Sequence, residues 1–303
     1  MTRRRPILWA SAALLAVFTY DAVVRPALLG LVELPLVPGG LKVLTLILTL
    51  FSVAHAWYSL GGRATAIFFG LSAAISWGYE QVGVMTGLVF GAYHYTDYLG
   101  PKLGDVPLLI PLAWFMMIYP SYVTANLIGA GRAEVTGGGV RGLIGLAAIS
   151  AVVMTAWDLV IDPILSGPSA RAWIWETGGP YFGIPIQNYS GWLLTTFSVY
   201  LAYRWLARRW AGAAAIESGR AASAVWVLPV AAYGLMLVAD LLSGAAPAGL
   251  VVIGPVVMGV PLVVAVGRIL GPSDRATGDN PDQRSAATEL SGPWYRPESD
   301  GRS

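Results

Sequence analysis

Carboxylates inside apolar stretches are the residues of this chain that are best suited to chemistry. Glu80 lies in the segment 77–98, WGYEQVGVMTGLVFGAYHYTDY, and Asp158 and Asp162 lie in the run DLVIDP. A charged side chain at membrane depth costs about 2.5 to 3.5 kcal/mol on insertion scales, so an acid at such a position suggests function. One such acid can donate a proton and another can accept one. We therefore expect Glu80, Asp158 and Asp162 to be the catalytic candidates.

The composition places these acids in a membrane protein. Hydrophobic residues make up 56% and charged residues 12% of the 303 residues, and the mean hydropathy is +0.63. A soluble domain carries about 25% charged residues. The net charge of +2 and the scattered arginines indicate no nucleic-acid partner. Without cysteine there is no disulfide or thiolate ligand, and two histidines, His55 and His94, are too few for a typical multi-histidine metal centre.

The apolar stretches predict an all-α fold, a polytopic transmembrane bundle of about eight helices. Each stretch is close to the roughly 20 residues that a bilayer requires. The predicted helices span residues 7–31, 43–60, 64–84, 106–129, 141–161, 189–208, 222–242 and 249–270. Residues 271–303 are rich in Gly, Pro, Ser, Asp and Arg, so we expect a disordered cytoplasmic tail after a transmembrane domain of residues 1–270.

The distribution of arginine and lysine predicts that both termini are cytoplasmic. Arginines gather at the termini and in the even-numbered loops. The odd-numbered side holds fewer cations: Lys42, Lys102 and Arg171. At a rise of about 1.5 Å per residue, Glu80 and Asp158 both lie roughly 24 Å from the cytoplasmic ends of their helices. Asp162 follows Asp158 on the same helical face, so the three acids are expected to meet in one pocket on the outer side.

By the same count Asp21, on the first predicted helix, comes out at a nearby depth, and both Asp21 and Asp162 also have structural interpretations. Arg25 follows Asp21 by one helical turn, which predicts an ion pair near the membrane interface. Asp162 stands before Pro163, where a helix usually ends, so a solvated or capping carboxylate is equally consistent with its position. Glu80 remains the acid for which function is favoured most clearly, together with Asp158.

Two aromatic loops, residues 91–107 and 162–188, flank the level of the acids. Their rings fit either the aromatic belt of a membrane interface or the wall of a pocket. Their glycines and prolines indicate a fixed, irregular backbone packed over the helix ends. The candidate substrate-binding residues in and beside these loops are Tyr93, Tyr95, Trp114, Trp157, Trp173, Trp175, Tyr181 and Asn188.

Three motifs resemble the membrane-bound carotenoid biosynthesis family, of the carotenoid 1,2-hydratase type. They are the run 80–120, EQVGVMTGLVFGAYHYTDYLGPKLGDVPLLIPLAWFMMIYP, the DLVIDP run, and AWIWETGGPYFGIPIQNYSGW at 172–192, within a family-like core of about residues 64–210. The resemblance implies addition of water to the terminal double bond of an acyclic carotenoid end group, which gives a tertiary alcohol without an organic cofactor. It also implies a carotenoid in the cell membrane and water as partners, alongside other enzymes of the carotenoid pathway.

Such a hydration would begin with a proton from Glu80 to the less substituted carbon of the double bond, and water would capture the resulting tertiary carbocation. Asp158, or less directly Asp162, would orient that water and take its proton, although the donor and base roles also fit in reverse. Burial and a neighbouring carboxylate both favour a protonated acid. The aromatic faces that would stabilise the cation are those of Trp157, Trp114, Tyr93 or Tyr95.

Two other classes of protein stay open from the sequence. Asp158 and Asp162 have the D-x-x-x-D spacing with which membrane prenyltransferases and carotenoid elongases bind magnesium and a prenyl diphosphate. Such enzymes usually carry two aspartate-rich motifs on the cytoplasmic side, whereas this chain has one, and the charge pattern predicts it outside. A lipid-binding protein or proton-coupled transporter would also keep membrane carboxylates, but the two halves of the chain show no repeat.

Overall fold

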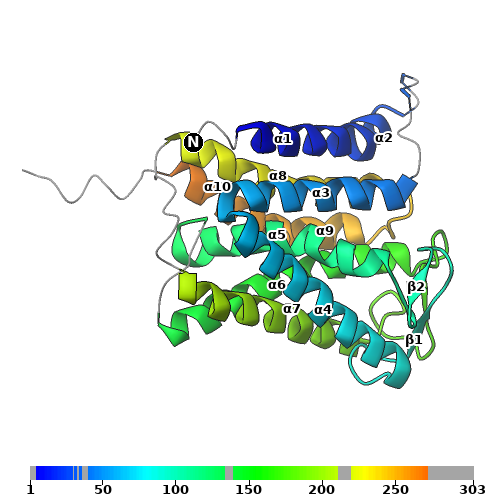
Figure 1. Ribbon diagram of the computed structural model, residues 1–303. Coiled ribbons are helices and arrows are strands. Elements are labelled where there is room, and N and C mark those ends of the chain that lie inside the picture. Colours follow the sequence, from blue (N-terminus) through cyan, green and yellow to red (C-terminus); the bar gives the residue numbers. More distant parts are fainter. Residues whose placement is uncertain are drawn as a thin grey trace, which may run out of the picture. The chain divides into compact units, whose positions relative to one another are not determined.

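The computed structural model describes residues 5–29, 31–32, 34–35, 40–133, 139–210 and 220–271. Contacts divide the chain into two units, Met1–Ile269 and Leu270–Ser303. The first unit carries the secondary structure shown in Figure 1. The predicted disordered tail lies outside the described residues, except for Gly271.

Eight helical segments form the described part of the chain, one for each predicted helix. The first is α1 (Arg5–Thr19), which continues through the π-helical turn η2 (Tyr20–Val24) into α2 (Arg25–Ala27). The others are α3 (Gly40–Leu60), α4 (Gly62–Thr86), α5 (Leu109–Ala130), α6 (Val140–Leu165), α7 (Ile186–Ala207) with the short 3-10 turn η3 (Arg208–Trp210), α8 (Arg220–Leu242), and the consecutive pair α9 (Leu250–Val257) and α10 (Gly259–Leu270).

Helix α5 lies at the centre of the packing because it is apolar on all sides. Every side chain from Trp114 to Leu127 is buried. Helices α3, α4, α6 and α8 all pack against it, and Figure 1 shows α4 running obliquely across the neighbouring helices. A helix that is hydrophobic all round must be enclosed. In this fold the enclosure of α5 comes from other helices of the same chain.

Five of the described helical segments are long and apolar enough to cross a membrane. They are Arg5–Ala27, Gly40–Leu60, Val140–Leu165, Val225–Leu242 and Leu250–Leu270. Helix α7 has the most serine, threonine, tyrosine and asparagine of the described helices, and α4 contains Arg63, Glu80 and Gln81. The fold is therefore that of a helical membrane protein in which the more polar helices also pack into the bundle.

The two aromatic loops are joined by a short sheet that the sequence did not predict. Strand β1 (Tyr93–Tyr95) in the first loop pairs antiparallel with β4 (Trp173–Trp175) in the second. The first loop also contains a hairpin of β2 (Lys102–Leu103) and β3 (Val106–Pro107). Figure 1 shows β1 and β2 together at one end of the helices. The sequence predicted an irregular backbone in these loops, whereas part of each loop forms regular strand pairs.

Proline positions explain two differences between the predicted and observed helix bounds. The predicted fourth helix begins at residue 106, but Pro107 belongs to β3 and α5 begins at Leu109. The predicted fifth helix ends before Pro163, whereas α6 continues to Leu165. A proline removes the hydrogen bond to the carbonyl four residues earlier. Here that carbonyl, of Leu159, accepts the Tyr181 hydroxyl at 2.8 Å instead, which compensates for the lost bond.

Candidate active site

Glu80 is a buried acid near the C-terminal end of α4, with 5% of its surface exposed. The hydroxyls of Tyr93 and Tyr95 both donate to its Oε2 atom, Tyr95 from 2.9 Å. The indole nitrogen of Trp114 donates to Oε1 from 3.1 Å. All three donors are neutral, so none of them is a fixed positive charge that would keep Glu80 ionised. The arrangement suits a carboxyl group that exchanges a proton.

The β1–β4 pairing positions the two tyrosines on Glu80. Alternate residues of a strand point to the same face, so Tyr93 and Tyr95 project together. Tyr93 lies opposite Trp175 in the sheet, and Tyr95 lies opposite Trp173. Burial and the nearby charge of Glu80 raise the pKa of both tyrosine hydroxyls, which therefore stay protonated and act as donors.

Asp158 and Asp162 form a second acidic group on α6, the aspartate pair. Both are buried, each with 1% of its surface exposed. The Asn188 side-chain nitrogen on α7 donates to Oδ2 of Asp158 at 2.9 Å and to Oδ2 of Asp162 at 2.7 Å. Trp173 donates its indole proton to Oδ1 of Asp162 at 2.8 Å. Two carboxylates that share one amide repel each other, and a proton on the pair relieves that repulsion.

The structure corrects the interpretation of Asp162 as a solvated or capping residue. Because α6 continues through Pro163, Asp162 stays inside the helix and points into the protein. Both of its carboxylate oxygens accept side-chain hydrogen bonds, from Trp173 and Asn188. The aspartate pair is thus built from one helical face, as the spacing of the two residues predicts.

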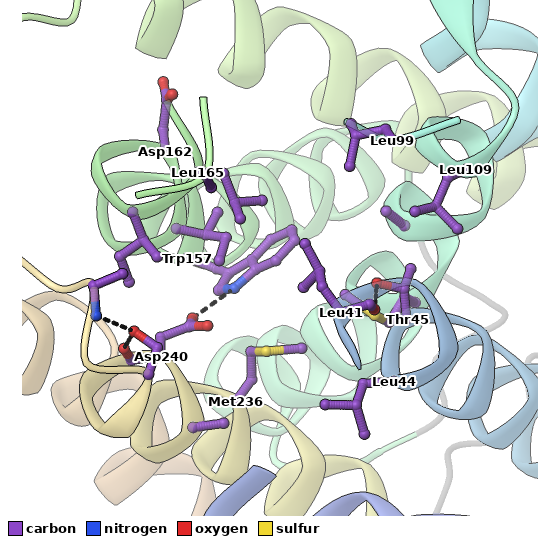
Figure 2. A pocket seen from close by; sticks show the side chains of 18 of the residues that line it. Leu41, Leu44, Thr45, Leu99, Leu109, Trp157, Asp162, Leu165, Met236 and Asp240 are labelled. Carbon is purple, nitrogen blue, oxygen red and sulfur yellow. Dashed lines mark hydrogen bonds between the residues drawn. The ribbon is translucent and has the colours of Figure 1, made fainter. Parts of the chain in front are cut away.

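Sequence reasoning missed a further buried acid, Asp240 on α8. It is 6% exposed, and the indole nitrogen of Trp157 donates to its Oδ2 atom at 3.1 Å, as Figure 2 shows. Asp240 lies near the end of an apolar stretch, which is the signal that identified Asp158. Trp192 was also missed, although it follows Asn188 by one turn of the same helix and therefore lies on the same face.

The acids surround a cavity of about 580 Å³ that most of the expected site residues share. The sequence-predicted residues that line it are Glu80, Tyr93, Tyr95, Trp114, Trp157, Asp158, Asp162, Trp173, Trp175 and Asn188. Asp240 and Trp192 line it as well, with apolar side chains such as Leu41, Leu44 and Met236 (Figure 2). The cavity is therefore mostly apolar, with a few buried carboxylates that converge on it.

Tyr181 is the one expected site residue that the structure places elsewhere. Its hydroxyl is bonded to the carbonyl of Leu159, and its ring packs edge-to-face on Phe182 and Tyr189. Burial raises the pKa of Tyr181 to about 12, so the hydroxyl remains a donor. Its contacts indicate a structural role in supporting α6 next to Pro163.

The predicted ion pair of Asp21 and Arg25 is confirmed, with the Arg25 Nε atom 3.2 Å from Oδ1 of Asp21. Asp21 is buried in the π-helical turn η2, and both residues border the cavity. The π-helical geometry was not predicted. A single extra residue in a helical turn often occurs at functional sites.

Neither histidine lies among the acids. His55 is fully buried, where its Nδ1 atom lies 2.7 Å from the Tyr119 hydroxyl and its Nε2 atom 3.0 Å from the Val225 carbonyl. His94 lies on the outer face of β1 and pairs with the exposed Glu176 at 3.2 Å. Both contacts are structural, since neither residue borders the cavity.

The fold and site define a helical membrane protein with an apolar cavity lined by buried acids at one end of its helices. The chain belongs to the carotenoid biosynthesis protein family, whose sequence model matches residues 41–266. This match extends beyond the core of about residues 64–210 on which the resemblance rests, and it includes α3, α8 and most of the last helical segment.

A curated relative of the chain is the bisanhydrobacterioruberin hydratase of Haloarcula japonica. It is 40% identical over 121 residues, which make up 40% of this chain and 38% of the relative. The aligned stretch thus spans less than half of the length of the relative. No solved structure matches the chain.

Proposed function

We propose that this protein is a carotenoid hydratase, which adds water to the terminal carbon-carbon double bond of an acyclic end group and yields a tertiary alcohol. Its family acts in carotenoid biosynthesis, and the similarity to a bisanhydrobacterioruberin hydratase supports hydration as the reaction. The observation that carries the proposal is that Glu80 and the aspartate pair border one largely apolar cavity. An apolar end group fits this cavity, and the acids supply the proton transfers.

Glu80 acts as the proton donor in this proposal. Its proton moves to the less substituted carbon of the terminal double bond, and the other alkene carbon becomes a tertiary carbocation. The carboxylate that remains on Glu80 is stabilised by its hydrogen bonds from Tyr93, Tyr95 and Trp114. Hydrogen bonds to the charged form of an acid favour that form. The three donors thus lower the free energy of the step in which Glu80 gives up its proton.

The aspartate pair acts as the base in the second step. A water molecule attacks the carbocation, and its proton passes to Asp158 or Asp162 as the C–O bond forms. The sum of both steps is the addition of one water, and one proton moves from the pair back to Glu80 before the next turnover. Asn188 donates to one oxygen of each carboxylate, which holds both acids beside the same amide, and either of them can accept the proton.

The cavity is matched to one end of a carotenoid. A volume of about 580 Å³ is in the range that holds a drug-sized molecule, which is far shorter than a whole polyene. Two residues that line it, Leu29 and Tyr98, are 75% and 41% exposed, so the cavity reaches the surface of the protein. We infer that the end group enters the cavity while the remaining polyene extends through this opening toward the lipid.

The proposed membrane topology rests on the distribution of arginine and lysine between the loops. We infer that all eight helical segments cross the cell membrane, with both termini cytoplasmic and the cavity near the outer side. Reporter fusions after residues 133 and 271 should then be active in the cytoplasm, and fusions at Gly104 should be active outside. Cytoplasmic activity of a reporter fused at Gly104 would show that the orientation is the reverse of the proposed one.

The hydratase proposal is tested in a host that makes lycopene or another acyclic carotenoid. Expression of the chain should convert the pigment to a product heavier by one water, or by two where both ends react. Glu80→Gln and Asp158→Asn should prevent this gain while the protein remains in the membrane. If no acyclic carotenoid gains water, or if both variants convert the pigment fully, the proposal is wrong.

A further inference from the structure

Three tryptophan rings form a continuous wall along the cavity. Trp114 on α5 stacks on Trp192 on α7, with ring centroids 4.0 Å apart and planes inclined by 20°. Trp192 in turn meets Trp157 on α6 edge-to-face, with centroids 6.1 Å apart at 79°. All three residues border the cavity. We call this group the indole ladder.

Both ends of the indole ladder are anchored on buried acids. At one end the Trp114 indole nitrogen donates to Glu80, and at the other the Trp157 indole nitrogen donates to Asp240, each at 3.1 Å. Figure 2 shows the Trp157 ring extending across the cavity with its nitrogen directed at the Asp240 carboxylate. An indole that donates to a carboxylate is held in one orientation, and electron density is drawn toward its ring. The acids therefore fix the rings and strengthen the negative potential of their faces.

The face of tryptophan is the best aromatic partner for a cation, and the attraction increases when water is excluded. Stacking covers one face of Trp114 and one face of Trp192, so the indole ladder can offer a cation the ring surface that borders the cavity. The stacked and edge-to-face contacts are the arrangements that aromatic pairs prefer, so they help to hold the three rings in place. These features suit a short-lived positive charge on carbon.

We propose that the indole ladder is the surface that stabilises the carbocation, with Trp192 as a further catalytic residue and Asp240 as a positioning residue that acts through Trp157. This inference rests on the proposed hydration. It adds two residues that are not among the candidates named from the sequence, and it gives Asp240 a role other than proton transfer, since its carboxylate accepts the Trp157 indole proton.

Two probes separate recognition of charge from recognition of shape. The first is a short isoprenoid amine whose terminal dimethylammonium group imitates the tertiary carbocation. The second is the neutral hydrocarbon in which carbon replaces the nitrogen. Binding of both to the full chain in detergent micelles is measured by quenching of tryptophan fluorescence or by calorimetry. Because no turnover is needed, the result does not depend on whether the protein hydrates a carotenoid.

Trp192→Leu should weaken binding of the ammonium probe by about tenfold, and Trp192→Phe by a smaller factor, because phenylalanine binds cations less well than tryptophan. Binding of the neutral probe should change by less than about threefold, which also shows that the variants are folded. Trp205→Leu is the matched control on the same helix, since Trp205 is half exposed and packs against Arg208 outside the cavity. Equal loss of both probes in Trp192→Leu, or no loss of either, would overturn the proposal.

Asp240 is tested by a double-mutant cycle with Trp157. Asp240→Ala and Trp157→Phe should each weaken the ammonium probe, and the double variant should be little weaker than either, because both changes break the same hydrogen bond. Asp240→Asn, which keeps an acceptor oxygen, should restore part of the affinity. Fully additive effects would exclude the positioning role. If the protein binds the ammonium probe as expected but hydrates no carotenoid, the proposed cation site is supported and the proposed hydratase function is wrong.

Discussion

Tyr95 on β1 donates its hydroxyl proton to Oε2 of Glu80 on α4 across 2.9 Å. This bond links the acid in the helix to the sheet that joins the two aromatic loops. The acidity of Glu80 therefore depends on the fold of a loop that follows it in the chain, as well as on its depth in the helix. Residues of the loop can be changed to test the acid without replacing it.

Tyr95→Phe should slow hydration by about 10- to 100-fold. A hydrogen bond to a charged group contributes about 1.5 to 3 kcal/mol, and each 1.4 kcal/mol corresponds to about tenfold in rate. The loss arises because the ionised Glu80 that remains after proton transfer lacks one of its donors. The rate is measured as conversion of an acyclic carotenoid in membranes that contain equal amounts of protein.

Tyr79→Phe is the control for this change. Tyr79 precedes Glu80 on α4, but its hydroxyl lies 3.3 Å from Ser198 on α7 rather than in the cavity. Its removal should leave the rate within about threefold of the wild-type rate, since this contact is between neutral groups. A Tyr95→Phe variant as fast as Tyr79→Phe would show that the hydroxyl of Tyr95 does not assist Glu80.

Hydration in heavy water should separate the proton donor from the base. Asp158→Asn should still place deuterium in the recovered carotenoid, because Glu80 continues to protonate the double bond and the cation then returns a proton from the same carbon to the Glu80 carboxylate. Glu80→Gln should give neither the alcohol nor labelled carotenoid, with a loss of about 100-fold or more. Mass spectrometry of the recovered pigment measures both outcomes.

Exposed acids provide the matched controls for the labelling experiment. Glu176→Gln changes the exposed glutamate that follows β4 and pairs with His94, and Asp105→Asn changes an exposed aspartate that accepts a hydrogen bond from Gln81 at 2.7 Å. Both variants should form the labelled alcohol at close to the wild-type rate. Deuterium in the pigment from Glu80→Gln but not from Asp158→Asn would show that Asp158 is the proton donor and Glu80 the base.

The helices could be predicted because apolar length and helical rise are local properties of the sequence. The same count brings Glu80 and Asp158 to one level, and the two residues do border one cavity. The β1–β4 sheet could not be predicted, because its strands are short and its pairing joins two loops that are distant in the chain. Tyr93, Tyr95 and Trp114 could therefore be named as candidate site residues, but the sequence did not show that they donate hydrogen bonds to Glu80.

Other parts of the site depend on contacts that no local pattern contains. The role of Tyr181 follows from Pro163, which frees the Leu159 carbonyl, and only the folded chain shows that the hydroxyl fills the gap. Asp240 and Trp192 carried signals that were available in the sequence, namely depth and helical spacing. Their significance comes from their neighbours, since each is defined by its contact with Trp157.

Removal of divalent metals should leave the hydration rate unchanged. The Asn188 amide nitrogen lies between Asp158 and Asp162, at 2.9 and 2.7 Å from their Oδ2 atoms, where a magnesium site would present oxygen ligands. Treatment with EDTA, followed by addition of magnesium, tests this expectation in membranes supplied with a carotenoid. Loss of activity on chelation, restored by magnesium and accompanied by consumption of a prenyl diphosphate, would favour a prenyltransferase instead.

Gly83→Ala should lower both stability and hydration. A Cβ atom at Gly83 would lie 2.7 Å from the Phe90 ring and 3.6 Å from the Tyr93 hydroxyl, so the ring must move and disturb a donor of Glu80. Such overpacking costs about 1 to 3 kcal/mol. Gly78→Ala is the control on the same helix: its Cβ meets nothing within 4 Å, and alanine favours a helix over glycine by about 0.5 to 1 kcal/mol. In detergent, the unfolding temperature should therefore fall for Gly83→Ala and rise slightly for Gly78→Ala. The conversion rate should fall for Gly83→Ala alone. Equal behaviour of the two variants would show that Phe90 has room to shift.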